Sequence, residues 1–299
     1  MNEPPWLSNA LARVRGMGAR LPHALLVHGP PGWGGDRVAN ALALDLMHLD
    51  SGRDAREVAH PDLRWLQPED GVIRVDAIRE IVEFLLQTPQ AAGRKIAVVE
   101  DADRMNLNAA NALLKSLEEP PGDSFIALST SAPEQLLPTV RSRCQEIRIR
   151  RGGADEVRDW LDAAGVDPEQ AGFWAVEYGG APFTIALAAE QGRTPLWKSL
   201  EKAARSPAAA RAAGVALRDE GLVDLLERWL RITHWLMRQT VPDRMSVLDF
   251  ATEMQNVRRA ALVNTGLNRT MQLQRLLLLW AELWRHAPIP GVPKTALGS

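Results

Sequence analysis

Apolar and amphipathic segments alternate along the first half of the chain, which is the pattern of a layered α/β domain. Five short apolar segments have the length of strands: His23–His28, Leu63–Gln67, Lys95–Glu100, Phe125–Thr130 and Gln145–Arg150. Three segments between them repeat apolar residues at helical spacing: Arg37–Leu49, Val75–Leu86 and Ala109–Glu118. This alternation predicts a parallel sheet flanked by helices, because parallel strands need crossover connections.

The strand pattern stops after Arg151-Gly152-Gly153, where the glycines indicate a boundary. Three short helices are expected next, at Ala154–Ala164, Pro168–Tyr178 and Pro182–Gln191. Beyond Pro195 the pattern indicates only longer amphipathic helices. We therefore expect three domains, an α/β domain over residues 1–151, a small helical domain over 152–193 and a helical bundle over 194–299.

Composition narrows the classes of function. The 299 residues are 46% hydrophobic and 24% charged, as in ordinary globular proteins, and the formal charge of -2 gives no bulk attraction to nucleic acid. One cysteine excludes an internal disulfide and a multi-cysteine zinc site. The first ten residues have no apolar core, and no apolar run is long enough to cross a bilayer, so we expect a cytoplasmic protein without signal peptide or membrane contact.

The first strand leads into a segment that resembles a nucleotide-binding phosphate loop. Such loops read G-x-x-x-x-G-K-[S/T], in which the lysine binds phosphate and the hydroxyl holds Mg²⁺. The segment Gly29–Asp36, with glycines at 29, 32 and 34, keeps the spacing between Gly29 and Gly34. Gly35 replaces the lysine and Asp36 replaces the hydroxyl, so a neutral residue and an anion stand where a cation and a metal ligand are needed. We expect a degenerate nucleotide site with no cofactor.

The strand that ends at Glu100 and Asp101 resembles a Walker B element, in which acids hold Mg²⁺ and orient water. A buried strand that ends in polar residues at the surface is the simpler alternative. The distance from the degenerate loop favours the Walker B origin, but we expect no catalytic use of these acids.

Two further motifs resemble the clamp-loader branch of the AAA+ proteins. The segment Leu107–Pro121 reads L-N-A-A-N-A-L-L-K-S-L-E-E-P-P, and Ser142-Arg143-Cys144 forms the branch's S-R-C motif. Within the branch, the likeness is greatest to the delta-prime type of bacterial DNA polymerase III subunit. Thr265–Arg269 also resembles a turn of the branch's collar domain. The resemblance implies an AAA+ α/β domain, a helical lid and an all-α collar used in oligomerisation.

The resemblance also implies roles for single residues. In clamp loaders, the S-R-C arginine of one subunit reaches the γ-phosphate of ATP on its neighbour, and the matching residue is Arg143. Ser142 would start a short helix or turn, and Cys144 would pack rather than react. Thr130 falls at the sensor-1 position, and Pro182 replaces the sensor-2 arginine. The alternative for Arg143 is an ordinary exposed arginine in an arginine-rich chain.

The sequence gives weaker evidence for metal binding and DNA contact than for the motifs above. Many relatives of this type carry a four-cysteine zinc module, but here the corresponding region, Asp45–His60, has no cysteine. His48 and His60 lack further fixed ligands, so we expect a surface loop and no metal. Lys115, Arg94 and Lys95 are candidates for phosphate contact. The helical tryptophans could stack on bases but are expected to pack in the core.

Three functions follow as alternatives. The first is a non-hydrolysing delta-prime-type subunit that lends Arg143 to a neighbour's ATP. Its expected partners are the tau/gamma and delta subunits, the sliding clamp and, through the assembled complex, primer-template DNA. The second is an active ATP-hydrolysing motor of the tau/gamma type, and the third is a helical scaffold that descends from this family.

Overall fold

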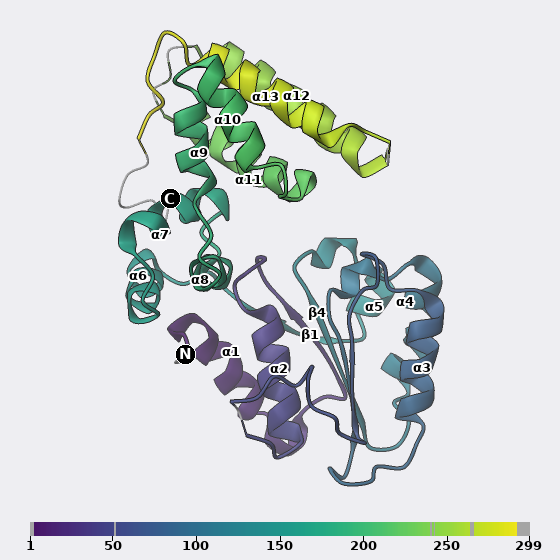
Figure 1. Ribbon diagram of the computed structural model, residues 1–299. Helices are drawn as coiled ribbons and strands as arrows, with labels where there is room; N and C mark the ends of the chain where they lie inside the picture. Colours follow the sequence, from purple (N-terminus) through teal and green to yellow (C-terminus); the bar gives the residue numbers. More distant parts are fainter. Residues whose placement is uncertain (1–2, 51, 240, 242, 264–265, 292–299) are drawn as a thin grey trace. The chain divides into compact units, whose positions relative to one another are not determined.

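The computed structural model describes residues 3–50, 52–239, 241, 243–263 and 266–291 of the chain (Figure 1). The chain divides into two compact units, Met1–Gly152 and Gly153–Ser299. The division falls one residue after the expected end of the α/β domain. A split of the second unit into lid and collar stays a prediction.

A five-stranded parallel sheet forms the centre of the first unit, in the order β2-β3-β4-β1-β5. Its strands are β1 (Ala24–His28), β2 (Leu63–Leu66), β3 (Lys95–Val99), β4 (Ser124–Thr130) and β5 (Gln145–Arg148). All residues of β1, β3 and β4 are buried, as expected of central strands covered on both faces. The predicted parallel sheet flanked by helices is confirmed, with strand ends that differ by a few residues.

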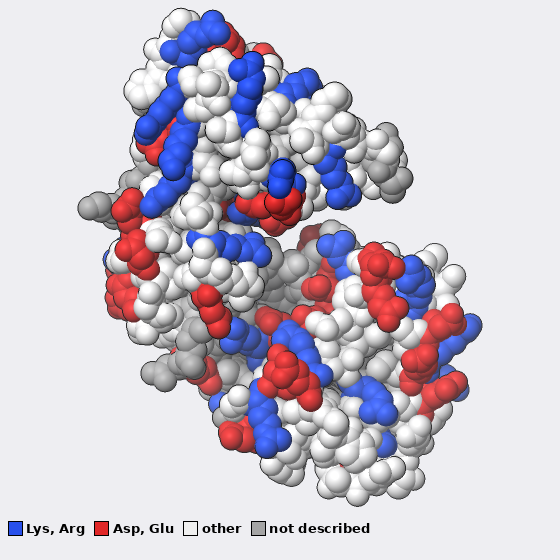
Figure 2. Space-filling model, viewed as in Figure 1, with Lys and Arg blue, Asp and Glu red and all other residues white. Residues whose placement is uncertain are grey.

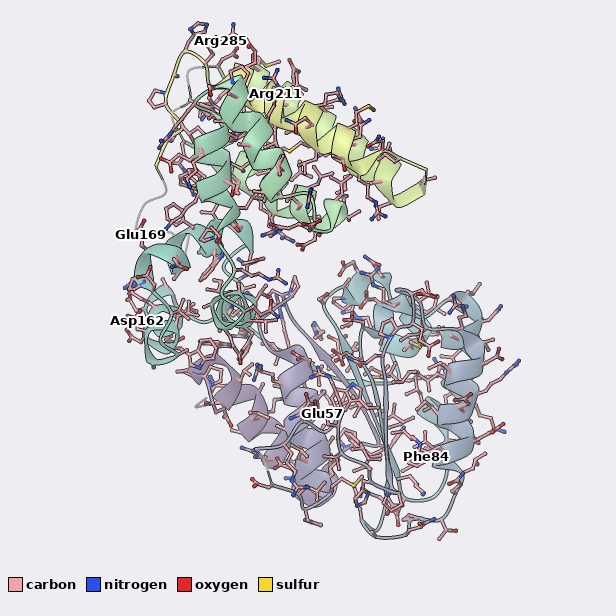
Figure 3. All side chains as sticks on the ribbon, in the orientation of Figure 1. Glu57, Phe84, Asp162, Glu169, Arg211 and Arg285 are labelled. Carbon is pink, nitrogen blue, oxygen red and sulfur yellow. The ribbon has the colours of Figure 1, made fainter. Side chains whose placement is uncertain are left out.

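Helices cover both faces of this sheet. Figure 1 shows α1 (Pro5–Arg15) and α2 (Gly35–Leu46) on one face, and α3 (Val75–Leu85), α4 (Leu107–Glu118) and α5 (Pro138–Arg141) on the other. Phe84 lies between α3 and the sheet as part of the buried core (Figure 3). Because the strands are parallel, their carboxyl ends share one edge, and the loops at that edge carry the candidate site.

The sequence reasoning did not predict helix α1. Pro5 occupies its first turn, where a missing N–H costs nothing, and Trp6, Leu7, Ala10, Leu11 and Val14 form its buried face. These apolar residues recur at helical spacing. The helix was missed because the segment is short and proline-rich.

A buried ion pair ties together the loops at the opposite edge of the sheet. The Asp62 carboxylate accepts hydrogen bonds from the backbone N–H groups of Gln90, Ala91 and Ala92, and the Lys95 ammonium lies 3.0 Å from it. Burial alone would raise the pKa of Asp62, but these donors lower it well below its usual range. The segment His60-Pro61-Asp62 is therefore structural.

The second unit is entirely helical in its described part. Its helices are α6 (Ala154–Ala163), α7 (Pro168–Glu177), α8 (Pro182–Glu190), α9 (Leu196–Ala203), α10 (Pro207–Ala216), α11 (Leu222–Met237), α12 (Arg244–Val263) and α13 (Arg269–Leu283). The structure confirms the packing role of the helical tryptophans at 160, 174, 229, 235, 280 and 284, all of which are buried. Trp229 and Trp280, for example, meet edge to face with ring centroids 5.5 Å apart.

The collar-like turn at Thr265–Arg269 lies partly outside the described residues, since Thr265 is not among them. Asn268 caps α13 by accepting a hydrogen bond from the backbone N–H of Met271 at 2.9 Å. No helix in the described ranges is long and apolar enough to cross a membrane.

Candidate functional site

The degenerate loop has the backbone shape of a phosphate loop. It follows β1, and its last residues begin α2. Gly32 and Gly34 have φ angles of 71° and 91°, which favour glycine. A Cβ on Gly29 would lie 2.6 Å from the Cβ of Ile149, so only glycine allows this close approach to the end of β5. The glycines thus keep the backbone conformation of a phosphate loop, although the lysine and the hydroxyl residue that bind phosphate and Mg²⁺ are replaced.

An arginine joins the two acids of the degenerate site. Arg56 lies in the loop between α2 and β2, and its Nη2 donates to the Asp36 carboxylate at 3.0 Å. Its Nε and Nη2 donate to both oxygens of Glu100 at 2.9 and 3.0 Å. A fixed guanidinium therefore bridges the position of the missing hydroxyl and the Walker B-like acid.

Both carboxylate oxygens of Glu100 are engaged by donors of this chain. Besides Arg56, the indole N–H of Trp65 and the amide of Gln67 donate to its Oε2 at 2.8 and 3.0 Å. Oε2 therefore accepts three hydrogen bonds and Oε1 accepts one. Burial would raise the pKa of Glu100, but these bonds and the charge of Arg56 lower it. The carboxylate is held ionised and paired with Arg56.

The cavity left beside the loop is small and negatively charged. It measures about 150 Å³, below the roughly 300–1,000 Å³ of typical ligand pockets. Asp36, Glu100 and Asp101 line it, and its described lining holds no lysine or arginine. Burial, with the nearby charges of Asp103 and Glu100, raises the pKa of Asp101. Such a lining disfavours a polyphosphate.

The two sensor-like residues, Thr130 and Pro182, make contacts within the fold. Thr130, the last residue of β4, donates its hydroxyl hydrogen to Asp103 and accepts a hydrogen bond from the N–H of Ala132 at 3.0 Å. Pro182 is buried and begins α8, where it can make no charged contact. Neither side chain offers a free donor to a nucleotide.

The S-R-C motif connects α5 to β5. Arg143 donates from Nε and Nη2 to Glu118 at the end of α4, and from Nη1 to the carbonyl oxygen of Thr139 at 2.8 Å. Its side chain keeps 31% of its surface exposed. Ser142 caps the C-terminal end of α5 and lies in the turn that follows, so it starts a turn, as one of the two predicted alternatives has it, and not a helix.

Cys144 is half-buried against the core of the first unit. Burial, assisted by the charge of Glu146, raises the pKa of its thiol to about 12. The thiol is therefore protonated at neutral pH and packs rather than reacts.

The candidate metal ligands do not form a site. In the loop before β2, His60 accepts a hydrogen bond at Nδ1 from the N–H of Asp62, and the described residues contain no group of three or more His, Cys, Asp and Glu side chains suited to a metal.

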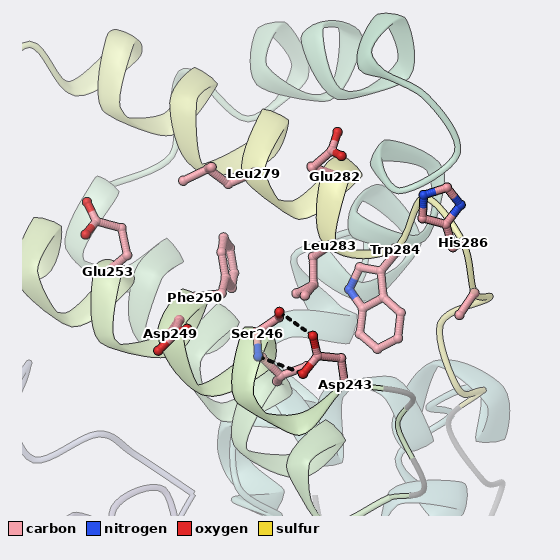
Figure 4. Close-up of a pocket in the computed structure, with 12 residues that line it drawn as sticks. Asp243, Ser246, Asp249, Phe250, Glu253, Leu279, Glu282, Leu283, Trp284 and His286 are labelled. Atoms are coloured by element: carbon pink, nitrogen blue, oxygen red, sulfur yellow. Dashed lines mark hydrogen bonds between the residues drawn. The ribbon is translucent and has the colours of Figure 1, made fainter.

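A second cavity, of about 560 Å³, lies between α12 and α13 in the second unit. Figure 4 shows Phe250, Leu283 and Trp284 at its apolar floor, while Asp249 and Glu253 are among its acids. Its chemistry suits apolar or basic groups. On the face shown in Figure 2, basic and acidic side chains lie close together over both units, so neither has a single-sign surface there.

Arg56 is the site residue that the sequence reasoning missed. It lies in the region predicted only as a surface loop, and no motif or spacing marks it. The nearby acids gave a weak hint, since Asp54 also pairs with Arg56 at 3.2 Å. Its role depends on the loop folding back over the end of β3.

Comparison with known proteins identifies the family. Residues 9–152 match the family model described as "DNA polymerase III, delta subunit". The DNA polymerase III subunit delta' of Pseudomonas aeruginosa is 33% identical, with 96% of this chain and 98% of that protein covered. The chain belongs to the delta-prime family of DNA polymerase III clamp-loader subunits.

Other members of the delta-prime family match mainly one half of the chain. The Escherichia coli subunit delta' is 37% identical over 47% of each chain. In fold, the chain resembles a DNA polymerase III gamma subunit-related protein from Thermotoga maritima, with a TM-score of 0.59 at 18% identity, over 93% of this chain and 99% of that one. This likeness supports the fold, a parallel α/β unit followed by a helical unit.

Proposed function

We propose that the protein is a non-hydrolysing clamp-loader subunit that supplies Arg143 to ATP held by a neighbouring motor subunit. The observation that carries this proposal is the Arg56 bridge between Asp36 and Glu100. Arg56 is hydrogen-bonded to both acids of this chain's own site, whereas the side chain of Arg143 stays partly exposed to solvent.

The degenerate loop argues against hydrolysis by this chain. Mg²⁺ needs oxygen ligands, and the attacking water needs an acceptor. Glu100 is held by Arg56, Trp65 and Gln67, Asp36 is paired with Arg56, and the lysine position holds Gly35. ATP binding would have to break this network and place phosphates beside three acids.

The contacts of Arg143 suit a finger. A guanidinium binds carboxylate and phosphate with the same planar geometry, so a neighbour's γ-phosphate can replace Glu118 as its partner. Glu118 and the Thr139 carbonyl would keep the side chain extended at the surface before assembly. Such fingers contribute roughly 10³–10⁵ in rate in related phosphoryl-transfer systems.

An ATP-hydrolysing motor is the second candidate, because the chain is also 30% identical to the DNA polymerase III subunit tau of Bacillus subtilis over 66% of its length. Turnover separates the two functions. If the protein is a non-hydrolysing subunit, the isolated chain hydrolyses no ATP in the presence of Mg²⁺. Repeated hydrolysis of ATP by the isolated chain would favour the motor.

The remaining partners follow from this role. The subunit would act in the cytoplasm beside tau/gamma and delta subunits, in a complex that places the sliding clamp on primer-template DNA. Its second unit would supply the lid over residues 152–193 and the collar over 194–299.

Reconstitution of the complete complex tests the finger. We expect Arg143→Ala to assemble normally but to reduce clamp loading and the partner's ATPase at least tenfold. Arg143→Lys should restore little, because it keeps the charge but loses the planar fork. Arg211→Ala is the matched control, since Arg211 is exposed on α10 (Figure 3). Undiminished loading by a correctly assembled Arg143→Ala complex would refute the finger.

A further inference from the structure

A cavity of about 680 Å³ opens at the carboxyl edge of the sheet, beside the degenerate loop. We call it the basic cavity. Its lining includes the arginines at 141, 148, 150 and 151 together with Glu146 and Ser131. All these residues belong to the first unit, and the volume is within the range of small-molecule sites.

The lining is strongly basic. Four arginines against one glutamate give it a formal charge of +3, in a chain with a net charge of -2. A concave surface with one sign of charge concentrates ligands of the opposite sign. The nearby loop cavity has the opposite charge, so the two recesses select different ligands.

The geometry of β5 places Glu146 and Arg148 on one side, and Arg150 follows two residues after the end of the strand. Glu146, Arg148 and Arg150 alternate along the chain with the buried Ile147 and Ile149. Residues two apart in a strand lie on one face, roughly 7 Å apart. His28 lies opposite Arg148 in the register of β1 and β5, and its Nε2 contacts Glu146 at 3.1 Å.

Two of the arginines are available to a ligand. Arg148 and Arg150 are exposed, and within the described ranges neither side chain has a hydrogen bond or an ion pair. The one acid is already neutralised, because Glu146 accepts hydrogen bonds from Arg141 at 2.9 Å and from His28 at 3.1 Å. These bonds lower the pKa of Glu146, so it stays ionised and paired.

We propose that the basic cavity binds neighbouring phosphate groups of a phosphate-bearing ligand, with Arg148 and Arg150 as the principal contacts. Guanidinium groups bind phosphate through paired N–H donors, and the hydroxyl of Ser131 can add a further donor. Pro30, Pro133 and Ile149 give apolar walls for a sugar or base. The ligand is a free polyphosphate or nucleotide, or the backbone of a nucleic acid strand.

This site is separate from the finger, and it shares only Gly29, Pro30 and Ser131 with the cavity of the degenerate loop. Arg143 does not line the basic cavity, and the cavity between α12 and α13 has an acidic lining that disfavours phosphate. Removal of Arg143 should therefore leave phosphate binding unchanged, which separates failure of this inference from failure of the proposed function.

Calorimetric titration of the full chain at low salt tests the proposal. Inorganic tripolyphosphate and a short single-stranded oligonucleotide are titrated in separate arms, which distinguishes the two ligand sources. We expect at least one of them to bind, and the Arg148→Gln/Arg150→Gln double variant to weaken that binding at least tenfold. Arg211→Gln should bind as the unaltered chain does.

Binding should weaken as salt rises, because phosphate contacts release counterions. Three outcomes would overturn the proposal: no binding in either arm at low salt, equal binding by the double variant, or equally tight binding of a polyglutamate of matched charge. The last outcome would show a general anion surface rather than a phosphate site. A circular dichroism spectrum of the double variant checks that both substitutions leave the fold intact.

Discussion

Arg56 donates two hydrogen bonds to Glu100, one to each carboxylate oxygen, at 2.9 and 3.0 Å. The same guanidinium reaches Asp36, the residue that replaces the hydroxyl of a phosphate loop. The chain thus provides its own cation at a site where a motor subunit would hold lysine and Mg²⁺. Under the proposed function, this arrangement would combine the loss of nucleotide chemistry with a gain in local stability.

The first prediction is that Arg56→Ala destabilises the protein. It leaves Glu100 and Asp36 without their shared cation, and loss of hydrogen bonds to charged groups costs roughly 1–3 kcal/mol. The free energy of unfolding, measured with urea, should fall by this amount. Arg53→Ala, an exposed change in the same loop, should have little effect. Equal stability of the two variants would show that the bridge contributes nothing.

The second prediction concerns pH. The pKa of Glu100 is lowered in the folded chain, so its pairing with Arg56 contributes fully above the ordinary glutamate pKa of about 4.3. The contribution is lost as pH falls through the folded pKa. The difference in unfolding free energy between the unaltered chain and Arg56→Ala should therefore be constant near neutral pH and shrink below about pH 4. A difference that grows on acidification would contradict this.

The third prediction is that Gly35→Lys alone creates no ATPase. An added Cβ at Gly35 meets no atom within 4 Å, so the lysine can be accommodated. Glu100 would still be paired with Arg56, Asp36 would still replace the hydroxyl, and Pro182 would still replace the sensor-2 arginine. Hydrolysis is measured by phosphate release, with the unaltered chain as control. Turnover by Gly35→Lys would show that the other losses matter less than the lysine.

The fourth prediction concerns the stability that the buried ion pair of Asp62 and Lys95 contributes to the fold. Asp62→Asn should cost about 3–5 kcal/mol, because Lys95 is 1% exposed and would lose its counter-charge. Asp62→Asn/Lys95→Met removes the stranded charge and should recover part of the loss. Urea unfolding measures both. A double variant no more stable than Asp62→Asn would show that the lost backbone hydrogen bonds, rather than the charge, dominate.

The sequence alone determined most of the architecture. Apolar runs and helical periodicity located the five strands and most helices, because burial imposes these patterns locally. Helix α1 was missed, since its proline-rich start hides a short apolar face. The glycine spacing and the S-R-C motif located the candidate loop and the candidate finger Arg143, because both motifs are contiguous in sequence, and their roles stay predictions.

Only the tertiary structure decided how the site is filled. Arg56 is 20 residues from Asp36 and 44 from Glu100, so their contact depends on how the loop before β2 folds back over the sheet. The basic cavity likewise needs the register that sets His28 of β1 beside Arg148 of β5. Local patterns record which side chains are buried, whereas contacts between distant loops depend on the packed chain as a whole.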